Sequence, residues 1–206
     1  MLNYIIKYLK YILTLRYIKL LSYLSAKYLQ QSRQESHKYR YTYYYGFQII
    51  YGAINKFILL VTLGFLFNIL PQILLVTISF VSLRVWSGGL HFNSYTKCAY
   101  ISLLSFTIVG LLAKYIYLNQ IITAIIFLLI YLIIFKWVPV EHPNRPLTNN
   151  EKLKFKTIAL LILTILYIIN LLTDNIIIKN SIVYGVILSG IITIPIISNL
   201  DKNNNN

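Results

Sequence analysis

Apolar stretches separated by short polar joins dominate the chain after residue 45. Four of them are close to the length of a membrane span, at 99–118, 120–138, 157–173 and 181–200. A helix of about 20 apolar residues crosses the hydrocarbon core of a bilayer. The pattern therefore predicts an all-α polytopic membrane domain over residues 46–200, with no room for a separate soluble domain.

The stretch from Gly46 to Leu83 is too long for a single span. As one helix it would measure about 57 Å, nearly twice the hydrocarbon thickness. Pro71, with Asn68 and Gln72 beside it, marks the expected corner. Two spans at 49–69 and 72–86 then give about six transmembrane helices, and a re-entrant hairpin here is the alternative, with four spans. Either way the chain returns to the side it left.

Residues 1–45 contain no apolar run of spanning length, and basic residues interrupt them throughout. Asn3, Lys7, Lys10 and Thr14 fall on one stripe of a helix whose other positions are mostly tyrosine, isoleucine and leucine. This pattern is typical of a basic amphipathic helix that lies in the interface of an anionic leaflet. At the other end, residues 201–206 form an asparagine-rich tail that we expect to be disordered.

The composition supports a membrane protein, and the distribution of basic residues along the chain predicts its orientation in the membrane. The chain is 58% apolar and 12% charged with a net charge of +14, and so has too few polar side chains to cover a soluble globule. Basic residues gather in the N-terminal region and the 139–156 connection, which the positive-inside rule places in the cytoplasm. Counting spans from there puts residues 84–98 and the C-terminal tail on the cytoplasmic side as well.

Residues 84–98 hold the candidate chemistry, with the sequence Arg-Val-Trp-Ser-Gly-Gly-Leu-His-Phe-Asn-Ser-Tyr-Thr-Lys-Cys. A thiolate at Cys98 is a nucleophile, and His91 is positioned in sequence to take its proton and return it to a leaving amine. His142, in the basic connection, is the rival base. One cysteine excludes an internal disulfide and a cysteine-rich metal site, and we expect no metal and no cofactor.

His91 and Cys98 act together only if the chain bends between them. On a straight helix they would lie about 10.5 Å apart along the axis, too far for proton transfer. Asn93 and Ser94 are good N-cap residues, so we expect the next helix to start there, with His91 on the preceding loop. Taken singly, these residues also have ordinary interpretations: Cys98 as packing, Gly88 and Gly89 as a close helix contact, and Arg84 as a side chain that reaches the headgroups.

The order of these residues resembles the AgrB-type accessory gene regulator membrane peptidases of quorum sensing. That family has an Arg, a Gly five residues on, a His two further and a Cys seven beyond, which Arg84, Gly89, His91 and Cys98 match. The basic N-terminal region and the proline-containing segment 141–147 are similar to the family as well. The resemblance extends over nearly the whole chain.

The resemblance implies a membrane-embedded cysteine endopeptidase that removes the acidic C-terminal tail of an AgrD-like precursor. Cys98 and His91 would be catalytic, the product a thiolactone, and the active unit a homodimer. Arg84, Gly88 and Gly89 would support the site, Arg84 either by pairing with a carboxylate of the tail or by orienting the loop. No acid lies between Glu35 and Glu141, which favours a dyad over a triad.

Two other functional classes stay open on the residues alone. Lys56 and Lys114 lie within apolar spans, where charges often mark the pathway of a small transporter or channel. Both also lie near predicted span ends or corners, where a lysine reaches the headgroups. A non-enzymatic membrane scaffold is the third class, and in it the His–Cys pair would have no role.

Overall fold

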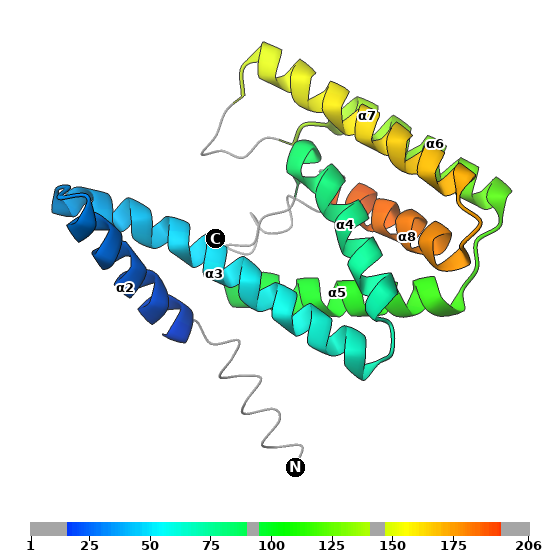
Figure 1. Cartoon of the computed structure of the whole chain (residues 1–206). Helices are drawn as coiled ribbons and strands as arrows, with labels where there is room; N and C mark the ends of the chain where they lie inside the picture. Colours follow the sequence, from blue (N-terminus) through cyan, green and yellow to red (C-terminus); the bar gives the residue numbers. More distant parts are fainter. Residues whose placement is uncertain (1–15, 90–94, 141–146, 195–206) are drawn as a thin grey trace, which may run out of the picture. The chain divides into compact units, whose positions relative to one another are not determined.

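The computed structural model describes residues 16–89, 95–140 and 147–194. These residues form seven helices and no strand (Figure 1). The helices are α2 (Arg16–Ser32), α3 (His37–Leu66), α4 (Leu70–Ser87), α5 (Tyr95–Tyr115), α6 (Gln120–Trp137), α7 (Asn149–Leu172) and α8 (Ile176–Thr193). Six of them, α3 to α8, are long and apolar enough to cross a membrane. The predicted all-α multi-pass architecture is confirmed.

The corner expected near Pro71 is present between α3 and α4. Asn68 adopts a left-handed backbone conformation with φ of 54°, which turns the chain. The backbone N–H of Ile69 donates to the carbonyl oxygen of Gly64 at 2.8 Å, closing the end of α3. Pro71 follows in the first turn of α4. Proline lacks a backbone N–H, and this costs nothing there because N–H groups in the first turn of a helix have no helical acceptor. The chain thus forms two long helices over the stretch that was too long for one.

The predicted starts of the last two spans were wrong, and the expected end at residue 200 lies outside the described residues. The expected span 157–173 is the later part of α7, which begins eight residues earlier, inside the expected 139–156 connection. A capping box starts it, with the N–H of Glu151 donating to Thr148 Oγ1 at 3.3 Å and the N–H of Thr148 donating to Glu151 Oε2 at 2.9 Å. The expected span 181–200 begins instead at Ile176, because the side chain of Asn175 caps α8.

The chain divides into two compact units. The first, here called the N-terminal unit, includes α2, α3 up to residue 60 and α5 up to residue 103. In it α2 packs on α3 through polar side chains: the hydroxyls of Ser25 and Tyr51 are 2.7 Å apart, and Tyr17 donates to the side-chain oxygen of Asn55. Lys19 and Lys27 of α2 are exposed, while the interfacial location expected for this basic segment stays a prediction.

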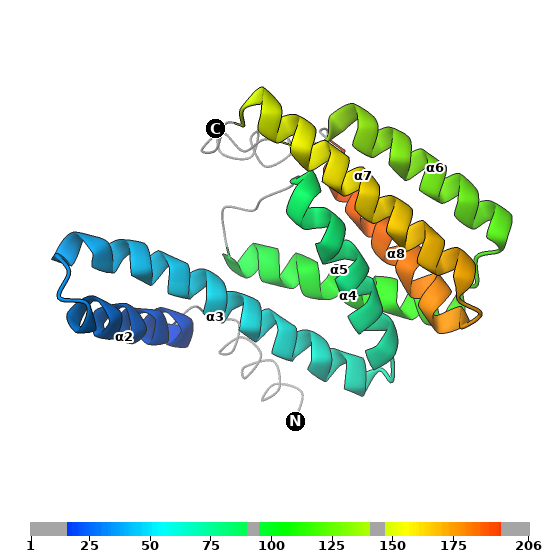
Figure 2. The same cartoon turned by 45° about the horizontal axis from the view of Figure 1, so that its top comes forward.

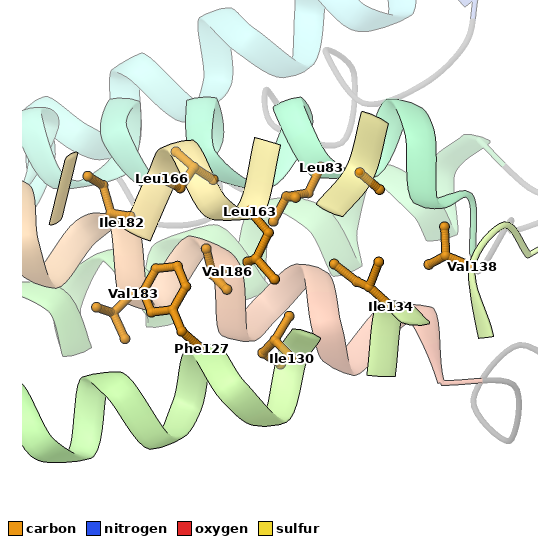
Figure 3. Close-up of a cluster of buried hydrophobic side chains, with 11 residues drawn as sticks. Leu83, Phe127, Ile130, Ile134, Val138, Leu163, Leu166, Ile182, Val183 and Val186 are labelled. Atoms are coloured by element: carbon orange, nitrogen blue, oxygen red, sulfur yellow. The ribbon is translucent and has the colours of Figure 1, made fainter. Parts of the chain in front are cut away.

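The second unit, here called the bundle, contains α4, α6, α7, α8, the end of α3 and the rest of α5. Its central helix is α8, which contacts α4, α6 and α7 (Figures 1 and 2). Half of the spanning stretch of α8 is buried, against about a quarter of that of α6 or α7, whose outer faces are left for lipid. The core of the bundle is drawn in Figure 3 and consists of Leu83, Phe127, Ile130, Ile134, Val138, Ala159, Leu163, Leu166, Ile182, Val183 and Val186.

Helices α4 and α8 run in the same direction. Gly185 packs against Ser79 in the middle of α4, and Ile192 at the end of α8 lies beside Gly89, just after α4. Helix α7 runs the opposite way, because the ring of Phe155 near its start lies 5.6 Å from Trp86 near the end of α4. One end of the bundle, here called the site end, therefore holds the ends of α4 and α8 and the start of α7.

A lysine suggested for a transport pathway instead joins elements at the opposite end of the bundle. The ammonium of Lys114 donates to the carbonyl oxygen of Asn68 at 3.0 Å and lies 5.3 Å from the ring centre of Tyr115. Lys114 therefore ties the end of α5 to the α3–α4 corner. This contact gives the lysine a structural role.

Candidate active site

The site end of the bundle carries a glycine turn directly after α4. Gly88 and Gly89 have φ of 70° and 123°, values that side-chain-bearing residues rarely adopt. The N–H of Gly88 still donates to the carbonyl oxygen of Arg84 at 3.2 Å, so the turn begins as the last bond of the helix. His91 follows Gly89 by two residues in the sequence.

Arg84 binds this turn. Its guanidinium donates to the carbonyl oxygen of Gly88, four residues on. The hydroxyl of Ser87, which is fully buried, donates to the same oxygen at 3.3 Å. Arg84 thus contacts the glycine turn, and both roles expected for it stay predictions.

Two further elements complete the turn. The N–H of Val140, which follows α6, donates to the carbonyl oxygen of Ser87 at 2.9 Å, and Gly88 and Val140 form an isolated parallel bridge. Gly89 is buried, and a methyl group on it would lie 2.8 Å from the carbonyl oxygen of Ile192 and run into the guanidinium of Arg84. Val140 approaches Gly88 closely, and Ile192 and Arg84 approach Gly89, so both positions require glycine.

Cys98 lies at the fourth position of α5, in the N-terminal unit. Its side chain is half-buried and forms no disulfide, and its sulfur is 4.0 Å from the hydroxyl of Ser102 one turn along the helix. Ala99 beside it is fully buried, and Tyr100 is exposed. The thiol thus sits at the start of a helix, partly covered and still accessible.

The structure groups part of the predicted site. Arg84, Gly88 and Gly89 form one turn, and Cys98 occupies the first helical turn of α5. His91 and the rival base His142 lie outside the described residues, so their relation to Cys98 stays a prediction. The expected start of the helix at Asn93 or Ser94 also lies outside them, although α5 begins at the following residue, Tyr95.

Four lysines lie on α6 and α7 at the site end of the bundle. Lys136 at the end of α6 lies 5.0 Å from the ring centre of Trp137, and Lys156 of α7 lies 5.4 Å from that of Phe135. Lys152 and Lys154 share the first turns of α7. The lysines of α7 lie at the same end of the bundle as the glycine turn, because Phe155 near the start of α7 contacts Trp86 near the end of α4.

Sequence reasoning did not identify Val140 or Ile192 as part of the turn. Both contribute backbone atoms, and a backbone contact leaves no requirement on the residue type that a single sequence can reveal. Pro139 beside Val140 was the only local signal. Ser102 was missed as well, although it lies one helical turn from Cys98.

Comparison with known proteins agrees with the residue pattern. The family model described as Accessory gene regulator B matches residues 18–194. A protein described as AgrB-like from Clostridium perfringens (strain SM101) is 29% identical over 75% of this chain and 74% of its own length. The accessory gene regulator protein B of Staphylococcus aureus (strain MRSA252) is 27% identical over 71% of this chain and 78% of its own. No solved structure matches the chain.

Proposed function

Since the chain belongs to the accessory gene regulator B family, we propose that it is a membrane-embedded cysteine endopeptidase of a quorum-sensing system. Its substrate is an AgrD-like precursor peptide with an acidic C-terminal tail, and its product is a peptide thiolactone. The carrying observation is the turn held by the Arg84–Gly88 hydrogen bond, three residues before His91, together with an accessible thiol at Cys98. His91 and Cys98 are the two members of the proposed dyad.

The proposed reaction has two acyl-transfer steps. The thiolate of Cys98 attacks the carbonyl carbon at the tail junction, and the carbon–nitrogen bond breaks while His91 delivers the thiol proton to the leaving amine. The thiol of the precursor's own cysteine then attacks this thioester and gives its proton to His91, and the bond to Cys98 breaks as the ring closes, with the proton passing to the sulfur of Cys98. One thioester replaces another, so the second step is nearly balanced in energy and consumes no water.

The glycine turn supports this assignment because a general base must be held in place. Proton transfer requires the two heavy atoms to approach to about 3 Å. Arg84, Ser87, Val140 and the end of α8 all contact the segment immediately before His91. A segment fixed from several elements suits a residue that has to meet a thiol on a different helix.

The lysines at the site end suit an acidic peptide tail. Lys136, Lys152, Lys154 and Lys156 provide positive charge beside the turn. Opposite charges raise the rate at which a charged peptide meets its binding surface. By the positive-inside rule the same charges support a cytoplasmic location for this end of the bundle, and we propose that the site and both termini are cytoplasmic as well.

Co-expression with a precursor peptide tests the proposal. We expect Cys98→Ser and His91→Ala each to abolish removal of the tail, with the protein still inserted in the membrane. His142→Ala is the matched control and should process the precursor as the unmodified protein does. The proposal is wrong if the Cys98→Ser protein still releases the tail, and the base is misassigned if His142→Ala alone is inactive.

A further inference from the structure

We propose that residues 138–140 form a strap that positions the turn before His91, acting through the main-chain N–H of Val140. The inference rests on the proposed function, because it assumes that His91 is the base. Val140 touches neither Cys98 nor a substrate in this scheme. Its role is to hold another residue in place.

The strap contacts the turn through backbone atoms. The N–H of Val140 donates to the carbonyl oxygen of Ser87 at 2.9 Å. Ser87 is the last residue of α4, so its carbonyl has no helical donor of its own. A methyl group on Gly88 would run into the carbonyl oxygen of Val140, which shows how closely the two segments lie. The side chain of Val140 is not needed for either contact.

Both sides of this link are anchored in the same core. Val138 is 3% exposed, and its N–H donates to the carbonyl oxygen of Ile134 at 3.0 Å, which closes the end of α6. Leu83, one turn before Ser87, is fully buried in the same hydrophobic cluster as Val138 and Ile134 (Figure 3). Close-packed cores deform little, so the residues on both sides of this hydrogen bond are held in fixed positions, and the bond fixes the turn.

The contact bears on the chemical step because His91 lies only four residues after Ser87. A displacement of about 1 Å at a reacting group is enough to slow a reaction about a hundredfold. Loss of the strap should therefore lower kcat and leave the KM of the precursor nearly unchanged. A smaller fraction of folded protein would also lower the apparent kcat at unchanged KM, so kcat is referred to the amount of folded protein.

The reactivity of Cys98 gives a test that needs no substrate, since it is the only thiol in the chain. We would measure the rate of alkylation by iodoacetamide at pH 7 in the purified full-length protein, because the thiolate is the reacting form. His91→Ala should slow alkylation about tenfold, as loss of a base predicts. Val140→Pro removes the N–H donor and should slow it to a similar extent.

Two variants separate the backbone contact from folding. Val140→Ala keeps the N–H, and we expect alkylation within about twofold of the unmodified rate, since the bond remains. Should Val140→Pro not fold, as judged by size-exclusion chromatography in detergent, Gly88→Ala disturbs the same contact from the other side and should also slow alkylation. Precursor cleavage by the folded variants then reports kcat and KM.

The possible outcomes distinguish the two proposals. If His91→Ala leaves the alkylation rate unchanged, His91 does not activate Cys98, and both the proposed dyad and the strap fail. If His91→Ala is slow while folded Val140→Pro or Gly88→Ala reacts at the normal rate, the strap is wrong and the dyad stands. Slow alkylation with an unchanged KM in the strap variants supports both.

Discussion

The side-chain amide of Asn180 donates a hydrogen bond to the carbonyl oxygen of Ile116 at 3.1 Å. The same amide donates to the carbonyl oxygen of Ala113 at 3.1 Å, and its oxygen accepts from the N–H of Leu118 at 3.4 Å. Asn180 is 2% exposed on α8, and these partners lie at and just beyond the end of α5. One side chain thus satisfies backbone groups that the end of a helix leaves unpaired.

Replacing Asn180 with leucine should destabilise the bundle. The change removes all three hydrogen bonds and leaves the carbonyl oxygen of the buried Ala113 without its donor, at a cost of about 1–3 kcal/mol, while the carbonyl oxygen of Ile116 keeps the hydroxyl of Tyr184. The shift of the unfolding transition of the purified protein in detergent would measure this loss of stability. Asn150→Ala, at an exposed position in the first turn of α7, is the control and should leave the transition where it is. An unchanged transition for Asn180→Leu would contradict the assigned bonds.

Two glycine substitutions should change stability in opposite directions. A methyl group at Gly185 would lie 2.8 Å from both the carbonyl oxygen of Val76 and the side chain of Ser79, so Gly185→Ala should cost about 1–3 kcal/mol. A methyl group added at Gly46, inside α3, would have no other atom within 4 Å. Gly46→Ala should therefore stabilise the helix by about 0.5–1 kcal/mol. Chemical denaturation of the two variants compares them, and equal effects would contradict the close α4–α8 contact.

Removing the capping box should loosen only the start of α7. Thr148→Ala deletes the hydroxyl that accepts from the N–H of Glu151, a change that typically costs about 1 kcal/mol. Hydrogen exchange should accelerate at the amides of Glu151 and Lys152, which bond to Thr148, and stay unchanged in α8. Thr157→Ala serves as the control, because the hydroxyl of Thr157 bonds within the helix, to the carbonyl oxygen of Leu153. Fast exchange in both variants would mean that the box does not define the helix start.

The lysines of α7 should affect substrate binding more than the chemical step. If the proposed function holds, Lys154→Gln with Lys156→Gln should raise the KM of an acidic-tailed precursor about two- to fivefold, and kcat should stay similar. Lys114→Gln, which removes one positive charge at the opposite end of the bundle, is the control. Added salt should raise KM in the unmodified protein and much less in the double variant, since salt screens exposed charges. An effect that persists with a neutral tail would point to folding instead.

The sequence predicted the spans well where a strong breaker or a polar join divides the apolar runs. The corner at Asn68 and Pro71 and the joint at Asn119 were placed correctly because left-handed turns, proline and N-caps restrict the backbone locally. The starts of α7 and α8 were missed, since polar first turns lowered the apolar signal where Thr148 and Asn175 cap the helices. The grouping of Arg84 with Val140 and Ile192 depends on packing between helices distant in the chain, which hydropathy does not encode.

The contact between Gly89 and the carbonyl oxygen of Ile192 has a consequence for biosynthesis. Ile192 belongs to α8 and leaves the ribosome about 100 residues after Gly89. A nascent chain therefore carries Arg84 and the glycine pair long before the helix that packs against them exists. Under the proposed function, the enzyme would become competent only after α8 has entered the membrane, which would prevent a partly inserted chain from cleaving peptide bonds.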